Sequence, residues 1–244
     1  MRIDRVELKR RAKGMLSTAT PSPIRVTLIF LAVSLLFSLL SARLLGLSLT
    51  QQDLEQILVH MENGNYDYAM SYITDYMPPA TSYIIDAALQ IASCIVSAGF
   101  TIFILNTVRG TGACFGNLLD GFGIFGRVLW LEILKWIFTT LWSLLFVIPG
   151  IIAAYRYRMA LYILIDHPEM SVMDCIRESK RMMKGHKAEL FCLDLSFIGW
   201  SILSSLAAIG WCVSIFTTPY FALTYAQYYE ILAGHVAGNY VETF

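Results

Sequence analysis

Long uninterrupted apolar segments constrain the fold of this chain more than any other feature. Residues 24–47 and 83–108 each exceed the roughly 18 apolar residues that mark a candidate membrane-spanning helix. Only 15% of the 244 residues are charged, against about 25% in soluble domains. These features exclude a soluble domain, a disordered chain and a nucleic-acid binder. The sequence therefore predicts an all-α, polytopic transmembrane helical bundle that forms a single domain over residues 1–244.

Six apolar segments are separated by polar stretches or by Pro/Gly pairs, and about six spans are expected. They cover residues 24–47, 83–108, 128–148, 151–165, 190–216 and 221–233. Pro149-Gly150 is predicted to be the tip of a hairpin, and Pro219-Tyr220 to separate the last two segments. Segments 151–165 and 221–233 reach only about 20 Å as helices, so whether they span fully stays open.

Lysine and arginine are unevenly distributed along the chain. They cluster before the first apolar segment, are absent between Arg43 and Arg109, and cluster again in residues 166–189. Cytoplasmic loops of membrane proteins are enriched in these residues. We therefore expect both termini, loop 109–127 and segment 166–189 to be cytoplasmic, and the acidic loop 48–82 to be extracytoplasmic.

Two basic segments are predicted to be amphipathic helices at the membrane interface. In residues 1–22, Leu8 and Ala12 belong to one apolar face; in residues 166–189, Ser171 and Gly185 are predicted to cap a helix over 172–184. Their charged faces would contact anionic lipid headgroups. The candidate contacts are Lys9, Arg10, Arg11, Arg177, Arg181, Lys184 and Lys187.

Loop 109–127 is rich in glycine but lacks a Gly-Lys-Ser/Thr sequence, so it does not predict a phosphate-binding loop. It is expected to be a flexible interfacial loop. Its apolar side chains would dip into lipid: Phe115, Leu118, Leu119 and Phe122.

Ionisable and amide side chains inside the apolar segments are the candidate functional residues, because a charge there needs a partner or a wet cavity. They form either buried ion pairs or a polar path between helices. The set is Asp86, Gln90, Glu132, Lys135, Arg156, Arg158 and Asp194.

Several pairings are open within this set. Glu132 and Lys135, three residues apart, can neutralise each other. Arg156 and Arg158 point about 200° apart on a helix, so we expect one to enter the bundle and the other to reach water or a phosphate. Glu132 is the nearest acid by depth, and Asp194 and Glu230 are alternatives. Segment 151–165 could instead only dip into the membrane, with both arginines binding lipid phosphate.

Catalytic and metal-binding signatures are missing from the sequence. The four histidines form no His-Glu-x-x-His motif, there is no Gly-x-Ser-x-Gly motif, and the five cysteines form no Cys-x-x-Cys pair. We expect no catalytic residue, no cofactor and no metal site, and hence no enzyme.

Four motifs occur in a fixed order in the second half of the chain. They are Pro149-Gly150-Ile151, Met183-Lys184-Gly185-His186-Lys187, Leu195-Ser196-Phe197-Ile198-Gly199-Trp200 and Pro219-Tyr220. Together with the basic N-terminal helix, they resemble the bacterial integral-membrane family known as domain of unknown function 975. The resemblance implies a polytopic protein of a bacterial cytoplasmic membrane and brings no activity.

Two functions therefore remain open. The first is a non-catalytic membrane protein that assembles with, or regulates, lipids, a membrane-protein partner or copies of itself. The second is a small transporter with a polar path between its helices. The two differ in whether Asp86, Glu132, Arg156 and Asp194 converge on one wet cavity or are paired separately.

Overall fold

The computed structural model describes residues 2–45, 51–67, 70–71, 78–206, 210–235 and 241–242. The chain divides into two compact units, residues 32–93 and residues 1–31 with 94–244. Each is described separately below. Asp75 and the side chain of Asp53, two acidic residues of loop 48–82, lie outside the described residues.

The smaller unit holds the end of helix α2 (Pro23–Leu45), helix α3 (Gln51–Glu62) and the start of helix α5 (Ala80–Arg109). Pro23 opens α2, where its missing N–H is not needed. The Ser41 hydroxyl of α2 donates a hydrogen bond to the Asp86 carboxylate of α5. A polar pair therefore joins two otherwise apolar helices.

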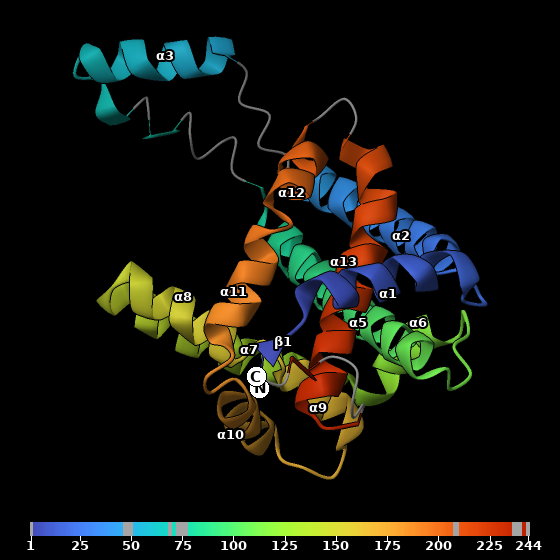
Figure 1. The fold of residues 1–244 in the computed structure, drawn as a ribbon. Helices are drawn as coiled ribbons and strands as arrows, with labels where there is room; N and C mark the ends of the chain where they lie inside the picture. The colour runs from blue at the N-terminus through green and yellow to red at the C-terminus, as the bar shows by residue number, and fades with distance from the viewer. Residues whose placement is uncertain are drawn as a thin grey trace. The chain divides into compact units, whose positions relative to one another are not determined.

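The larger unit contains the remaining helices (Figure 1). They are α1 (Arg5–Thr18), α6 (Asn117–Asp120), the 3₁₀ helix η1 (Gly121–Ile124), α7 (Phe125–Leu145), α8 (Val147–Arg156), α9 (Ala160–Asp166), α10 (Val172–Met182), α11 (Lys187–Leu195), α12 (Ile198–Ser205) and α13 (Gly210–Leu232). Two short strands, β1 (Arg2–Ile3) and β2 (Val241–Glu242), pair antiparallel. The protein is therefore all-α apart from this two-residue pairing.

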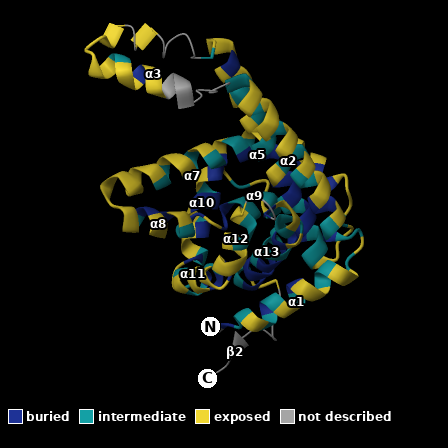
Figure 2. Cartoon of the chain, turned by 90° about the horizontal axis from the view of Figure 1, so that it is seen from above, coloured by how far each residue is buried: buried dark blue, intermediate teal, exposed yellow. Residues whose placement is uncertain are grey.

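Helix α13 forms the centre of the hydrophobic core. Its residues from Leu223 to Ile231 are almost all buried (Figure 2), and α1 and α12 both pack along it. Phe197, between α11 and α12, is buried against the rings of Tyr220 and Phe221.

Four helical segments are long and apolar enough to cross a membrane: Pro23–Leu45, Ala80–Arg109, Asn117–Leu145 and Val147–Asp166. A fifth is obtained if Lys187–Leu195 and Ile198–Ser205, bent by 48°, form one span. The helical membrane class predicted from the sequence therefore has structural support.

The predicted break at Pro219-Tyr220 is wrong, because α13 runs through Pro219 without interruption. Proline is tolerated in apolar helices where side-chain hydroxyls and neighbouring helices satisfy the backbone. Thr217 donates to the carbonyl of Val213, and Thr224 donates to that of Tyr220. The chain instead breaks between α11 and α12 and again before Gly210, so the predicted segments 190–216 and 221–233 are divided differently.

Helices α7 and α8 form the predicted hairpin, but the chain reverses at Phe146 rather than at Pro149-Gly150. Pro149 lies in the first turn of α8, where a proline costs little. A Cβ at Gly150 would lie 2.0 Å from Ser143 Oγ, so glycine permits the two helices to approach. The five residues from Leu144 to Ile148 are all exposed and apolar, with Leu144 84% exposed.

The glycine-rich loop 109–127 folds onto α5 as α6 and η1, so the expectation of a flexible loop is wrong. A Cβ at Gly99 would lie 2.2 Å from the carbonyl oxygen of Leu118, and one at Gly121 would lie 2.3 Å from that of Ile95. Leu118 is buried in the core, whereas Phe115, Leu119 and Phe122 are exposed. Glycine on both sides thus lets the backbones approach closely.

Replacing Gly99 by alanine is expected to lower the free energy of unfolding by about 1–3 kcal/mol, because the added methyl group meets main-chain atoms that cannot rotate away. Gly126→Ala is the matched control, since a Cβ there meets nothing within 4 Å. Thermal unfolding of both variants in detergent measures the difference. Equal midpoints would show that the close approach is not needed.

The two predicted amphipathic helices form with their expected caps, but their apolar faces contact protein. The N–H of Asp174 donates to the Ser171 hydroxyl, and Gly185 has φ +92°. In α1, Leu8 and Ala12 are fully buried. In α10, the apolar residues that were expected to face lipid are buried in the core with Cys175: Val172, Ile176 and Met183. The apolar faces are thus covered by α13, α7 and α9.

Candidate functional site

Asp194 is the centre of a polar cluster that joins three elements of the larger unit. Its carboxylate accepts hydrogen bonds from the hydroxyls of Tyr155 (α8) at 2.7 Å and Tyr225 (α13) at 2.6 Å. Arg158 Nη1 lies 3.5 Å from the same carboxylate, and its guanidinium lies 4.5 Å from the centre of the Tyr225 ring. Asp194 therefore ties α8 and α13 to α11.

Arg158, rather than Arg156, is the arginine that pairs with an acid. The expected partner Glu132 is incorrect, because its carboxylate binds Lys135 Nζ of the same helix at 2.7 Å and 3.0 Å. Arg158 lies in the turn between α8 and α9, and this irregular backbone directs it to Asp194. Arg156 ends α8, and its guanidinium lies 6.0 Å from the Trp142 ring.

Asp86 and Gln90, the two candidates in the smaller unit, have different surroundings. Asp86 is half-buried and accepts from Ser41, and Gln90 is exposed. Of the four residues that distinguish the two hypotheses, Asp86, Glu132 and Asp194 thus each have a partner of their own. The fourth, Arg156, lines a separate basic cavity.

Arg109 forms an ion-pair network that the sequence analysis missed. At the end of α5, its guanidinium binds both oxygens of Asp166 at 2.7 Å each, and its Nε donates to Glu230 Oε1 at 2.8 Å. Tyr229 donates to Asp166 at 2.6 Å. Asp166 is the last residue of α9, where an acid is unfavourable to the helix dipole, so the arginine offsets it.

Three side chains of this network have the residue types of a metal site. Ligand atoms of Asp166, Glu230 and His235 lie within 4.8 Å of one another. Arg109 already occupies both carboxylates, so a metal ion would have to displace a bidentate guanidinium. The group is therefore better described as an ion-pair network that ties the ends of α5, α9 and α13.

A cavity of about 420 Å³ is lined entirely by basic side chains. They come from the end of α8, from α10 and the turn after it, and from the start of α11: Arg156, Arg177, Lys180, Arg181, Lys184 and Lys187. Arg177 pairs with Asp174 and Arg181 with Glu178. In the part of the chain that the structure describes, the three lysines have no hydrogen-bond or ion-pair partner. The cavity thus concentrates positive charge.

The basic residues of α1 have protein partners. Arg10 and Arg11 bind Glu7 at 2.7 Å and 2.6 Å, and these hydrogen bonds lower the pKa of the Glu7 carboxyl to about 2. The Lys9 ammonium lies 4.5 Å from the centre of the Phe197 ring, and burial lowers its pKa. These three side chains are therefore less available to lipid than the lysines of the basic cavity.

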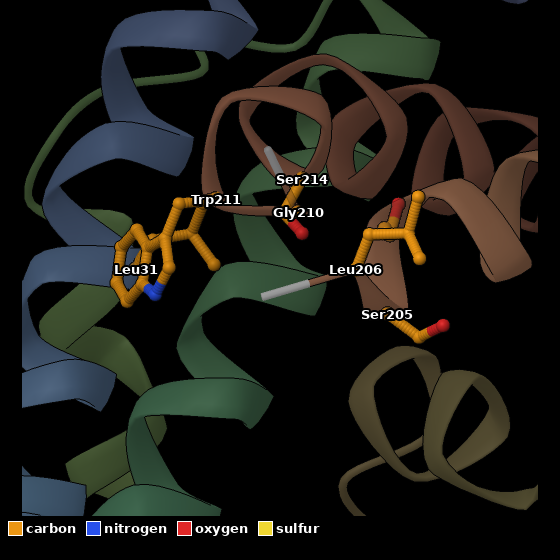
Figure 3. Close-up of a pocket in the computed structure, with 7 residues that line it drawn as sticks. Leu31, Ser205, Leu206, Gly210, Trp211 and Ser214 are labelled. Carbon is orange, nitrogen blue, oxygen red and sulfur yellow. The ribbon is translucent and has the colours of Figure 1, made fainter. Parts of the chain in front are cut away.

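Serines around a small pocket of about 210 Å³ hydrogen-bond their own helix (Figure 3). Among the lining residues on α12, Ser204 donates to the carbonyl of Trp200 and Ser205 to that of Ile202. Ser201, one turn earlier, donates to the carbonyl of Phe197. Hydroxyls satisfied within their own helix do not form a continuous polar path.

The fold and these clusters together define an all-helical protein with four or five candidate membrane spans, its polar side chains held in local networks. Residues 144–235 match the family described as Protein of unknown function (DUF975). The match confirms the resemblance drawn from the four motifs, all of which lie inside it; Arg109 lies outside. No curated protein and no solved structure matches the chain.

Proposed function

We propose that this is a non-catalytic, multi-pass protein of a bacterial cytoplasmic membrane that acts in membrane assembly or regulation. Both termini are placed in the cytoplasm, and the basic residues of α10 and α11 contact anionic lipid headgroups. A membrane-protein partner or a second copy of the chain is the proposed binding partner. The distribution of basic residues supports this orientation.

The separate pairing of charged side chains is the observation that carries the proposal. Glu132 pairs with Lys135, Asp194 with two tyrosines and Arg158, and Arg109 with two acids. A transport path would need such groups to line a shared wet cavity. The pockets found in the described residues are lined by other residues, except that Arg156 borders the basic cavity.

Exposed apolar surface supports the membrane placement. The hairpin of α7 and α8 exposes bulky side chains along both helices and at its tip, including Trp136 at 70% and Phe146 at 68%. Contiguous apolar surface of this kind is uncommon on monomeric soluble proteins. The surface fits contact with lipid or with another membrane protein.

Purified protein in liposomes tests the proposal against the transporter alternative. We expect a screen of ions, amino acids and sugars to show no flux above protein-free liposomes, and cross-linking in native membranes to capture the chain with a second copy or another membrane protein. Asp194→Asn keeps the shape of the side chain and removes its charge. Solute flux that is present in the wild type and lost in this variant would contradict the proposal.

A further inference from the structure

We propose that the basic cavity between α8, α10 and α11 is a binding site for a group carrying two or more phosphates, as in the headgroup of a diphosphorylated lipid. The inference extends the headgroup contact of the proposed function from a general surface attraction to one defined site. It adds Arg156 and Lys180 to the residues expected from the sequence.

The chemistry of the lining indicates an anionic ligand. All six lining residues are cations, and the only acids paired with them, Asp174 and Glu178, are on α10 and do not line the cavity. Like charges this close destabilise one another unless an anion neutralises them. Arginine and lysine are the residues that bind phosphate, arginine as a bidentate donor and lysine as a point charge.

The cavity is fixed in place by buried contacts, so its cations are preorganised. The Ser179 hydroxyl, fully buried on α10, donates to the carbonyl of Arg156 at 2.8 Å. On the other side, Tyr228 of α13 donates to the carbonyl of His186 at 3.1 Å, which holds the turn that leads to Lys187. A ligand therefore meets a formed site and does not have to order three helices.

The size of the cavity favours more than one phosphate. Its volume of about 420 Å³ falls in the range of small-ligand pockets, about 300–1,000 Å³. With three of its six cations lacking any carboxylate partner in the described residues, the site can neutralise several negative charges. Basic pockets of this kind next to membrane-spanning helices bind multiply charged lipid headgroups.

The hairpin tip identifies a lipid as the favoured source of these phosphates. Arg156 is nine residues from Val147 at the start of α8, which is about 14 Å along a helix. Half of a bilayer core is about 15 Å thick. When the exposed apolar tip reaches the middle of the bilayer, Arg156 is therefore at the depth of the headgroup phosphates.

The test compares two double variants of the full chain in detergent. Lys180→Gln with Lys184→Gln removes two exposed cations of the cavity, and Arg5→Gln with Lys13→Gln removes two cations of α1 as the matched control. Each protein is titrated with diphosphatidylglycerol, with phosphatidylcholine, and with inorganic pyrophosphate. Native mass spectrometry counts the bound ligand.

We expect one diphosphatidylglycerol per chain in the wild type, about 30-fold weaker binding in the cavity variant and a change of about twofold or less in the control. Equal binding of every ligand to both variants would overturn the site. A difference for pyrophosphate without one for the lipid would overturn the lipid as the source and keep the phosphate chemistry. Solute flux in liposomes would overturn the proposed function without affecting this result.

Discussion

Arg109→Ala is expected to lower the free energy of unfolding by about 3–5 kcal/mol and to reduce the yield of folded protein sharply. The substitution leaves two carboxylates without their cation, and both side chains are nearly inaccessible, Asp166 at 8% and Glu230 at 3% exposed. Thermal unfolding and size-exclusion chromatography in detergent measure the loss.

Two comparisons separate the ion-pair network from a general effect of losing an arginine. Arg177→Ala removes an arginine that is 72% exposed and paired with Asp174, so we expect little change. Adding Asp166→Asn and Glu230→Gln to Arg109→Ala removes the stranded charges and should restore part of the stability. If Arg109→Ala unfolds at the temperature of Arg177→Ala, the network does not stabilise the fold.

Asp194→Ala is expected to lower the free energy of unfolding by about 3 kcal/mol, because it removes the acceptor of two tyrosine hydroxyls and the partner of Arg158 at once. Arg158→Ala should cost about 1 kcal/mol, since its side chain is 39% exposed and both tyrosines keep Asp194. Arg156→Ala should change stability least, because its guanidinium has no acid partner among the described residues.

Unfolding temperatures of the three single variants test this order directly. Asp194→Ala combined with Arg158→Ala should be less destabilised than the sum of the two single variants, because the arginine is no longer left without its partner. Strict additivity, or equal effects of Arg156→Ala and Arg158→Ala, would show that Asp194 does not organise this cluster.

The helical class and the limits of most apolar segments follow from composition and periodicity. The predicted segment 83–108 lies within Ala80–Arg109, and the Ser171 cap and Gly185 are found as expected. The behaviour of Pro219 could not be predicted in this way, because a proline's effect depends on packing. In α13 the buried contacts from Leu223 onward, together with the hydroxyl of Thr217, keep the helix continuous.

Side-chain pairing was predictable only where it is local. Glu132 and Lys135 are three residues apart, and helix geometry alone brings them together. Arg109 and Glu230 are 121 residues apart, and Tyr155 and Asp194 are 39 apart. Neither pairing follows from periodicity. Arg109, Asp166 and Glu230 share one signal that points to their network: each ends, or nearly ends, an apolar segment on the side predicted to be cytoplasmic.

The close approach of α5 to α6 and η1 has an evolutionary consequence. The nearest atoms to a Cβ at Gly99, or at Gly121, belong to the main chain of the facing segment. Every residue type carries the same main chain, so no second substitution at Leu118 or Ile95 can make room. Gly99 and Gly121 should therefore show no covariation with the positions they touch, and each should stay glycine in any descendant that keeps this crossing.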